Sequence, residues 1–264
     1  MIKIKDFRMD EVRVTRRMID GAPVAHVVID RREKLNALDS DLTTRLTTVL
    51  NELSDDREIR AVVLEGAGGK AWVGGADINE MAGLDVGNAT AFIENLHHAM
   101  VAVRDFPVPV IASLDGYCLG AGMELAAACD MRLASTKAHF GMPETQVGLV
   151  SVIEASLLPG LMGRGRAARL VLTGEVINAL RAYEWGFVEE LVEPDRLVAA
   201  VDAVLGNLCR AGPNAVRAQK RLLREWETLT PDDGALAGVP YFERGYETGE
   251  PQEMLARFAK RPKS

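Results

Sequence analysis

Apolar and polar positions alternate or recur along the chain in ways that predict a mixed α/β fold. Residues 12–16 and 24–29 are rich in apolar and β-branched side chains, and the glycine-proline turn at 21–23 predicts a β-hairpin between them. Over residues 39–53 the apolar side chains recur every three or four positions behind a capping residue, which predicts a helix. The short apolar run at 61–64 is typical of a buried strand. The first unit is therefore strand, strand, helix, strand.

A second unit of similar order follows. A helix is expected over residues 89–104, a strand over 108–113 and a further helix that opens near Gly122. Residues 131–134 are typical of another strand, and 138–140 of a short extended segment. The order of elements repeats although the sequence itself does not.

Helical patterns dominate from about Val152 onward. Four segments begin with a capping residue or with a proline suited to a first helical turn, at Asn178, Asp195, Pro213 and Pro231. We place a boundary near Pro194, so that residues 1–194 form the main domain and residues 195–264 form a helical appendage.

Composition indicates a soluble globular protein. The 264 residues are 48% hydrophobic, which can supply a sizeable core. No apolar run reaches membrane-spanning length, and residues 1–6 alternate in charge where a secretory signal would be apolar, so we expect a cytoplasmic protein with no membrane partner. The net charge of −7 argues against broad nucleic-acid binding. Cys118, Cys129 and Cys209 are odd in number and lack metal-ligand spacing, so we expect reduced and mostly buried thiols.

Neither a metal nor a nucleotide cofactor is expected. The four histidines lack zinc-site spacing, and His97 and His98 on a predicted helix are expected to face solvent. Residues 66–71 match a permissive form of the dinucleotide fingerprint, but residues 72–75 are typical of a loop where a Rossmann site needs a helix. The chain has no Gly-Lys-Ser or Gly-Lys-Thr phosphate loop, so NAD and ATP are not expected.

Two glycine-rich turns and two carboxylates carry the strongest chemical signal. The turns are Gly74-Gly75-Ala76-Asp77 and Gly120-Ala121-Gly122, and the carboxylates are Glu124 and Glu144. Such turns can aim backbone N–H groups into a cleft, and a pair of carboxylates can move protons, so together they form the parts of an oxyanion-stabilising acid/base site. Each part also has a structural explanation alone: paired glycines make tight turns, a buried helical glutamate needs a partner, and proline-glutamate often starts a helix.

At these residues the chain resembles the crotonase superfamily, the enoyl-CoA hydratases and isomerases. The resemblance runs from Arg32-Glu33-Lys34-Leu35-Asn36-Ala37-Leu38 to Phe258-Ala259-Lys260-Arg261. It implies a crotonase-like β-β-α spiral core with a C-terminal helical oligomerisation region, and a homotrimer or a dimer of trimers. It also implies an acyl-CoA substrate, with coenzyme A as part of that substrate and no separate cofactor.

The resemblance assigns roles to individual residues. The backbone N–H groups of Ala76 and Ala121 would form an oxyanion hole for the thioester oxygen. Glu124 and Glu144 would hold one water molecule, which Glu124 helps to activate while Glu144 supplies the proton delivered to the α-carbon. The further contacts to substrate or coenzyme A that it implies are Lys34, Ala37, Gly75, Asp77, Ile78, Gly120, Phe258 and Lys260. The basic segments 31–34 and 260–263, otherwise solvated surface charge, become candidate contacts for the phosphates of coenzyme A.

Retention of both glutamates favours syn addition of water to a 2-enoyl-CoA thioester. Within the same superfamily the alternatives are an enoyl-CoA isomerase and an acyl-CoA hydrolase that use the same oxyanion hole. An alternative of a different class is a non-catalytic acyl-CoA-binding or RNA-binding member. The acidic charge balance and the intact glutamate pair disfavour that alternative.

One segment departs from the hydratase pattern. Val152 stands where hydratases carry a glycine that contacts the catalytic water, and the bulkier wall predicts a preference for short or unusually shaped acyl groups. Glu154 is a third acid near the site in sequence. It is either a carboxylate on a helix surface or an additional polar group in the acyl pocket.

Overall fold

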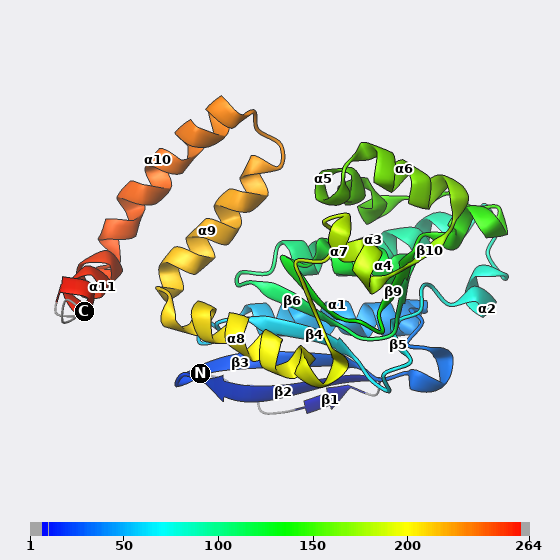
Figure 1. Cartoon of the computed structure of the whole chain (residues 1–264), viewed down its shortest axis with the longest axis horizontal. Helices are drawn as coiled ribbons and strands as arrows, with labels where there is room; N and C mark the ends of the chain where they lie inside the picture. Colours follow the sequence, from blue (N-terminus) through cyan, green and yellow to red (C-terminus); the bar gives the residue numbers. More distant parts are fainter. Residues whose placement is uncertain (1–6, 10, 260–264) are drawn as a thin grey trace.

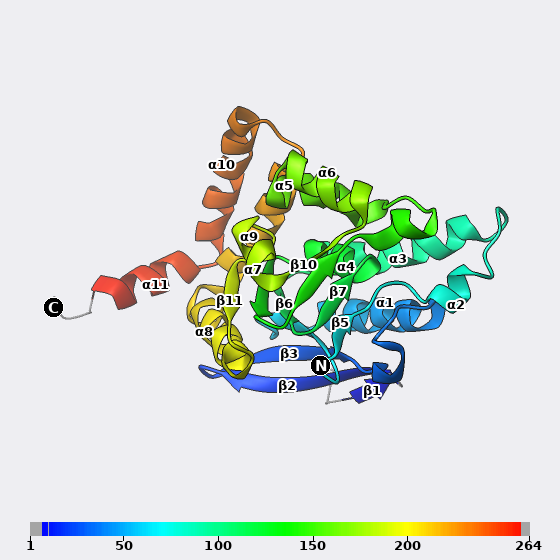
Figure 2. The ribbon, with the colours of Figure 1, turned by 45° about the vertical axis from the view of Figure 1, so that its right-hand side comes forward.

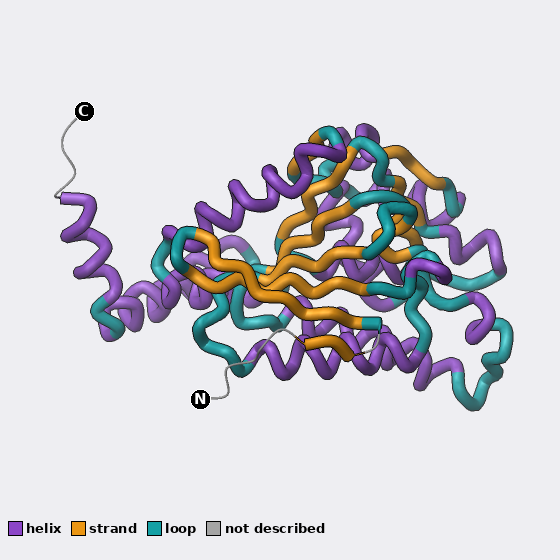
Figure 3. The backbone as a smooth tube through the Cα atoms, turned by 90° about the horizontal axis from the view of Figure 1, so that it is seen from below, coloured by secondary structure: helices purple, strands orange, loops and turns teal. Residues whose placement is uncertain are grey.

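The computed structural model describes residues 7–9 and 11–259, which build two β-sheets wrapped by helices (Figure 1). The larger sheet has the strand order β1-β2-β3-β4-β6-β8-β11. Its strands are β1 (Phe7–Met9), β2 (Val12–Ile19), β3 (Ala22–Ile29), β4 (Val62–Gly66), β6 (Val110–Leu114), β8 (Met131–Ser135) and β11 (Glu190–Val192). The first three are antiparallel, with β2 and β3 forming the expected hairpin, and from β3 onward all neighbours are parallel. Figure 3 shows these strands side by side, in orange.

The smaller sheet has the order β10-β9-β7-β5 and consists of three-residue strands. They are β5 (Ala71–Val73), β7 (Tyr117–Leu119), β9 (His139–Gly141) and β10 (Val176–Asn178). Each of β5, β7 and β9 comes shortly after a strand of the larger sheet, so the chain alternates between the two sheets before it enters the next helix. This repeated path is the β-β-α spiral expected from the sequence, and the fold prediction is confirmed.

Three helices bury the main core against the sheets. They are α1 (Ser40–Ser54), α3 (Ala89–Arg104) and α4 (Ala121–Ala128), with contacts between α1 and α3 and between α3 and α4. Asp39 caps α1 by accepting a hydrogen bond from Leu42 N–H, and the apolar residues recognised by their spacing form its buried face. Every residue of α4 is buried, because this helix lies in the centre of the molecule (Figure 2).

A second, smaller core covers the other face of the larger sheet. Here α8 (Leu197–Arg210), which follows the short 3₁₀-helix η4 (Pro194–Arg196), packs on β2, β6, β8 and β11. Leu197, Val201 and Leu205 join strand residues such as Val63 in this cluster. The boundary expected near Pro194 therefore precedes a helix that covers the sheet, and the helices that leave the body begin after α8.

The last three helices form an arm that extends from the body. They are α9 (Pro213–Trp226), α10 (Pro231–Glu247) and α11 (Glu250–Ala259). Figures 1 and 2 show α10 beside α9 and α11 directed away from the sheets. The arm is fastened by Lys220 on α9, whose buried ammonium donates hydrogen bonds to Asp130 at 2.6 Å and to the carbonyl oxygen of Val108 at 3.1 Å.

Shorter elements complete the described chain. The helices are α2 (Ile78–Met81), α5 (Leu158–Met162), α6 (Arg164–Thr173) and α7 (Ala179–Glu184), and the further 3₁₀-helices are η1 (Arg32–Lys34), η2 (Pro143–Val147) and η3 (Ile153–Leu157). Asn178 caps α7 as its sequence predicts. Strands β10 and β11 were not expected within the helical C-terminal half, since three residues offer too few positions for an alternating pattern to be recognised. Among the described residues, no helix is long and apolar enough to cross a membrane.

Gly122 on α4 lies in close contact with the backbone of a strand. A β-carbon at this position would overlap the backbone carbonyl of Val73 at the end of β5. That overlap involves backbone atoms on both sides, so the two elements would have to move apart.

We expect Gly122→Ala to lower the free energy of unfolding by at least about 1–3 kcal/mol, because it overpacks the contact between α4 and β5. Gly160→Ala on α5 is the matched control, since a β-carbon there meets no atom within 4 Å. Urea unfolding followed by circular dichroism measures both variants. Equal stability of the two would contradict the assigned contact.

Candidate active site

The two glycine-rich turns expected to form an oxyanion hole lie side by side. Their strands, β5 and β7, are parallel neighbours, with Val73 opposite Cys118. Beyond the strands, a β-carbon built on Gly75 would lie 3.4 Å from the carbonyl oxygen of Leu119. The turn that contains Ala76 therefore adjoins the turn that starts α4 at Ala121.

Both candidate donors have backbone N–H groups that the fold leaves available. Leu38 binds the residues on either side of Ala76: its N–H donates to Gly75 O at 2.8 Å, and its carbonyl oxygen accepts from Asp77 N–H at 2.9 Å. Ala121 is the first residue of α4, so its N–H has no helical acceptor. Within residues 7–9 and 11–259, neither N–H donates to a protein acceptor. Two such groups at adjoining turns can bind one oxygen that carries negative charge.

Gly120 brings the carboxylate of Glu144 next to these donors. Its φ of +50° suits glycine, and a β-carbon on it would lie 2.5 Å from Glu144 Oε1. Glu144 stands in the first turn of η2 behind Pro143, and Ser151 Oγ donates to its Oε2 at 2.7 Å. A larger residue at position 120 would displace the carboxylate, so the glycine is required by the site and not only by the turn.

Glu124 approaches the same place from α4. Its side chain is 4% exposed, and its Oε1 accepts a hydrogen bond from the N–H of Ala155 at 3.2 Å. Burial and, after it, the negative charge of Glu144 raise the pKa of Glu124, and hydrogen bonds from the N–H groups of Ala155 and Val152 oppose the rise. The resulting pKa is about 8, so Glu124 holds a proton at neutral pH. In the protein without substrate, burial favours Glu124 as the holder of this proton.

The segment that donates to Glu124 is strained. Ile153, at the start of η3, has φ +37°, a backbone region that β-branched residues rarely adopt. Such a conformation costs about 1–3 kcal/mol and persists only where the surroundings impose it. Val152 before it is extended, with its side chain 39% exposed. The bulkier wall expected from the sequence is therefore combined with backbone strain.

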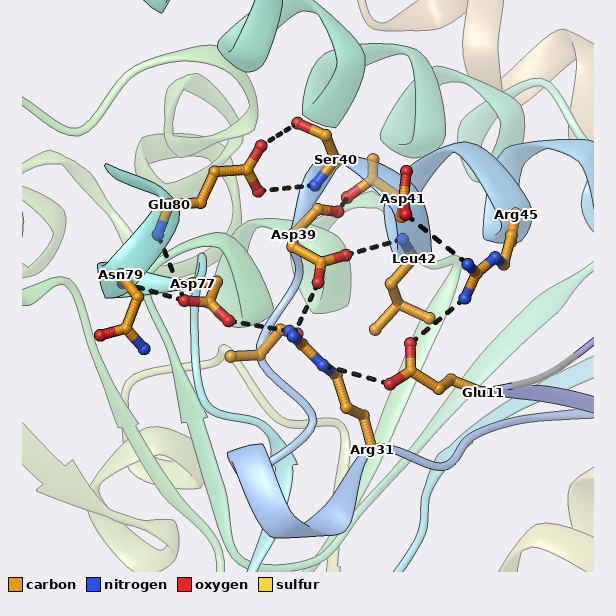
Figure 4. A network of polar contacts seen from close by, with 12 residues as sticks. Glu11, Arg31, Asp39, Ser40, Asp41, Leu42, Arg45, Asp77, Asn79 and Glu80 are labelled. Carbon is orange, nitrogen blue, oxygen red and sulfur yellow. Dashed lines mark hydrogen bonds and ion pairs between the residues drawn. The ribbon is translucent and has the colours of Figure 1, made fainter. Parts of the chain in front are cut away.

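Arg31 holds the turn that contains Ala76 (Figure 4). Its guanidinium binds three carboxylates, Glu11 at 3.2 Å, Asp39 at 2.7 Å and Asp77 at 2.9 Å, and it donates to the carbonyl oxygen of Ala37 at 2.9 Å. Glu11 directly precedes β2, Asp39 is the N-cap of α1, and Asp77 is the N-cap of α2. One arginine thus ties together the three segments that surround the oxyanion turn.

Several residues that were expected to contact coenzyme A belong to this network or lie next to it. Arg31 belongs to the basic segment 31–34 expected near phosphates, yet its nitrogen atoms are engaged by carboxylates. Asp77 is buried and caps α2; burial raises the pKa of this carboxyl, but the N–H groups at the start of α2 and Arg31 lower it below its usual value overall. Lys34 is exposed beside a polar pocket of about 480 Å³ that Arg31 and Asp77 also line. Ile78, 72% exposed, is the first residue of α2.

Of the two contacts expected near the C-terminus, the one within the described residues lies apart from this site. Phe258 is on α11, at the far end of the arm, and this chain does not bring it to its own glutamates (Figure 1). Lys260 and the rest of segment 260–263 lie outside the described residues.

The expected cysteine state is confirmed, because all three thiols are free and buried. Trp72, in a segment with a loop-like sequence, belongs to β5 and is 1% exposed.

Two side chains near the site were not anticipated correctly. Glu154 is 1% exposed and pairs with Arg104 and His97, so the interpretation as a helix-surface carboxylate is wrong. His97 was expected to face solvent but is half-buried by this contact, since its Nδ1 lies 3.0 Å from Glu154 Oε2. The contribution of Arg31 was missed as well. The residues that contact Glu154 and those that contact Arg31 are far from them in sequence. No local pattern therefore indicates the cluster around Glu154 or the cluster around Arg31.

Comparison with known proteins places this arrangement in a family. The family model described as Enoyl-CoA hydratase/isomerase matches residues 20–263. The chain is 32% identical to a short-chain-enoyl-CoA hydratase of Clostridium acetobutylicum, over 91% of this chain and 92% of that protein. It is 31% identical to a crotonyl-CoA hydratase of Syntrophomonas wolfei, over 91% and 93%. The crystal structure of an enoyl-CoA hydratase from Bacillus anthracis superposes with a TM-score of 0.90 and 30% identity, covering 95% of this chain and 96% of that one.

Because the pKa of Glu124 is raised in the folded protein, we expect the protein to lose stability as the pH rises. As the pH rises above about 4.5, the unfolded chain releases this proton, while the folded protein keeps it until about pH 8. The stability that Glu124 contributes is therefore fully present below pH 4.5 and is lost as the pH rises to 8. Glu124→Gln removes the titration, so we expect its melting temperature relative to the wild type to be higher at pH 8 than at pH 5.

Thermal unfolding at the two pH values measures this difference. Glu52→Gln, on the exposed face of α1, is the control for loss of one carboxylate. If the Glu124→Gln protein gains no relative stability between pH 5 and pH 8, the carboxyl is ionised in the folded state and the assigned burial effect is wrong.

Proposed function

The chain belongs to the enoyl-CoA hydratase/isomerase family, and from this premise we propose that it is an enoyl-CoA hydratase that adds water syn across the double bond of a 2-enoyl-CoA thioester. One observation supports the proposal most: Glu144 Oε1 lies against Gly120, directly before Ala121, and Glu124 stands three residues after Ala121 on the same helix, where the turns that contain Ala76 and Ala121 adjoin. Two carboxylates favour hydration, because addition needs one group to take a proton from water and another to give a proton to the α-carbon. The names of the hydratases with which the chain aligns support the same reaction.

The backbone donors would act on the charge that develops during addition. When water attacks the β-carbon, electrons move through the conjugated system to the thioester oxygen. Ala76 N–H and Ala121 N–H would stabilise that oxygen as it becomes enolate-like, and the N-terminus of α4 adds partial positive charge. Because both donors are main-chain groups fixed by β5, β7 and Leu38, they need no rearrangement during the reaction.

The two glutamates would balance the proton transfers. The ionised carboxylate accepts a proton from the water as its oxygen bonds to the β-carbon, and the protonated carboxyl donates a proton to the α-carbon. One proton enters the pair and one leaves it, so the pair ends with its proton on the other residue. In the roles that the resemblance implies, Glu124 would be the acceptor and Glu144 the donor. Burial in the substrate-free protein favours the proton on Glu124, so one transfer within the pair would precede addition.

The other reactions of the family are distinguishable in the same assay. A hydratase converts crotonyl-CoA into a 3-hydroxyacyl-CoA and leaves the thioester intact. A hydrolase would release the free thiol of coenzyme A, which a thiol reagent detects. An isomerase would convert a 3-enoyl-CoA into the conjugated isomer without adding oxygen, and a non-catalytic binder would leave every thioester unchanged.

The arm supports the proposal of a homotrimer or a dimer of trimers. On α10, Leu236, Val239 and Phe242 are 71%, 63% and 73% exposed. Phe242 also lines, with residues of α9 and α11, a groove of about 920 Å³. We propose that other copies cover this surface; light scattering that finds a monomer at micromolar concentration would contradict it. A cytoplasmic location and a role in fatty-acid metabolism stay predictions, and the free cysteines favour the first.

The paired carboxylates predict the effect of removing either one. We expect Glu124→Gln and Glu144→Gln each to lower kcat for crotonyl-CoA by about two to four orders of magnitude, because each variant loses one proton transfer. Binding of a saturated acyl-CoA, measured by calorimetry, should be nearly unchanged, since both changes are isosteric. Activity is followed by the loss of the conjugated enone absorbance.

The exposed Glu52→Gln variant should hydrate crotonyl-CoA at the wild-type rate. A glutamate whose replacement leaves hydration near normal has no proton-transfer role. Loss of acyl-CoA binding along with activity would instead show that the side chain shapes the pocket.

Val152 and Ile153 predict a preference for short acyl groups. Extra methylenes forced into a packed site cost about 1–3 kcal/mol, so kcat/KM for crotonyl-CoA should exceed that for the hexadecenoyl thioester. Val152→Gly should raise the long-chain value relative to the crotonyl value. Equal or better activity of the wild type on the long chain would remove this segment as the determinant of chain length.

A further inference from the structure

Glu154 is a buried carboxylate that no step of the proposed reaction uses. Its side chain is 1% exposed, and it lies in η3, one residue before Ala155, whose N–H donates to Glu124. A charge so deeply buried persists only with partners, since its desolvation is otherwise uncompensated. The partners therefore indicate what the residue does.

Both partners of Glu154 come from α3. Arg104 Nη1 donates to Oε1 at 3.3 Å, and His97 Nδ1 lies at hydrogen-bonding distance from Oε2, 3.0 Å away. Arg104 also binds Glu227, at the end of α9, at 2.6 Å. The carboxylate thus holds η3 against a long helix that is itself packed on α1 and α4.

The residue that precedes Glu154 needs such a restraint. Ile153 has φ +37°, and Val152 on its other side is extended. Nothing in a β-branched side chain favours this conformation, so it must be imposed by neighbouring contacts. Glu154, the next residue, is fixed to α3 by its polar contacts with Arg104 and His97.

The strained conformation has a consequence at the site. It places the N–H groups of Val152 and Ala155, one residue before Ile153 and two after it, toward the same carboxyl of Glu124. An unstrained path through Ile153 would rotate at least one of these groups away. The restraint on η3 and the placement of Glu124 are therefore linked.

We propose that Glu154 is a positioning residue, whose polar contacts with Arg104 and His97 hold Ile153 in its strained conformation and so keep the N–H groups of Val152 and Ala155 directed at Glu124. The catalytic consequence rests on the proposed hydratase function. The structural part of this proposal, that Glu154 restrains the backbone of residues 152–155, does not depend on that function.

The test combines loss of the restraint with relief of the strain. Glu154→Ala should lower kcat for crotonyl-CoA by about 10- to 100-fold, as expected for a displaced catalytic group, with KM changed by less than about threefold. Glycine adopts a positive φ without strain, so adding Ile153→Gly to Glu154→Ala should restore most of kcat. Arg104→Met removes a partner of Glu154 but keeps the carboxylate itself. In this variant too, kcat should fall while KM changes little.

Amide hydrogen exchange of the peptide that spans residues 151–157 provides a readout independent of activity. Exchange should accelerate in Glu154→Ala, while peptides from β4 and β6 stay at the wild-type rate. Glu94→Ala, an exposed carboxylate on α3, is the control and should change neither exchange nor kcat.

Wild-type exchange in Glu154→Ala, or a loss of kcat that Ile153→Gly fails to restore, would overturn the proposal. A wild-type protein that hydrates no enoyl-CoA would overturn the proposed function instead, and the exchange measurement would still decide whether Glu154 holds the segment.

Discussion

The close contact between the backbones of α4 and β5 is the constraint on which the site depends. Gly122 lies against the carbonyl of Val73, with no room for a β-carbon between them. This approach sets the first turn of α4 beside the end of β5, and hence Ala121 beside Ala76. It also directs Glu124, two residues further along α4, into the space under the same turn. Two donors and one carboxylate are therefore positioned by a single packing contact between main chains.

Charges buried around that contact divide into two kinds. Arg31, Lys220 and Glu154 have partners of opposite sign within hydrogen-bonding distance, so the cost of removing them from water is offset. Glu124 is buried beside backbone donors and the carboxylates of Glu144 and Glu154, and its pKa is raised. The uncompensated charge is thus confined to the residue for which a proton near neutral pH is useful, while compensated charges hold the surrounding segments.

The long elements and the site motifs could be predicted from the sequence, because each rests on local patterns. Helices α1 and α3 have enough residues for their apolar periodicity to be evident, and α3 begins and ends at the expected residues, Ala89 and Arg104. Strands β5 and β7 are too short for any pattern, although they place both oxyanion turns. The network of Arg31 and the burial of Glu154 depend on contacts between residues distant in sequence. Such contacts follow from the path of the spiral, which no single segment specifies.

The arm and the catalytic segment have one side chain in common. Arg104 binds Glu154 with one guanidinium nitrogen and Glu227, at the end of α9, with another. A chain shortened before α9 would leave this arginine with only its inner partner, and would remove Lys220 from Asp130 at the same time. The C-terminal helices therefore cannot be treated as a detachable module: truncation or domain fusion at the start of α9 alters the electrostatic surroundings of the glutamates, even though α11 lies far from them.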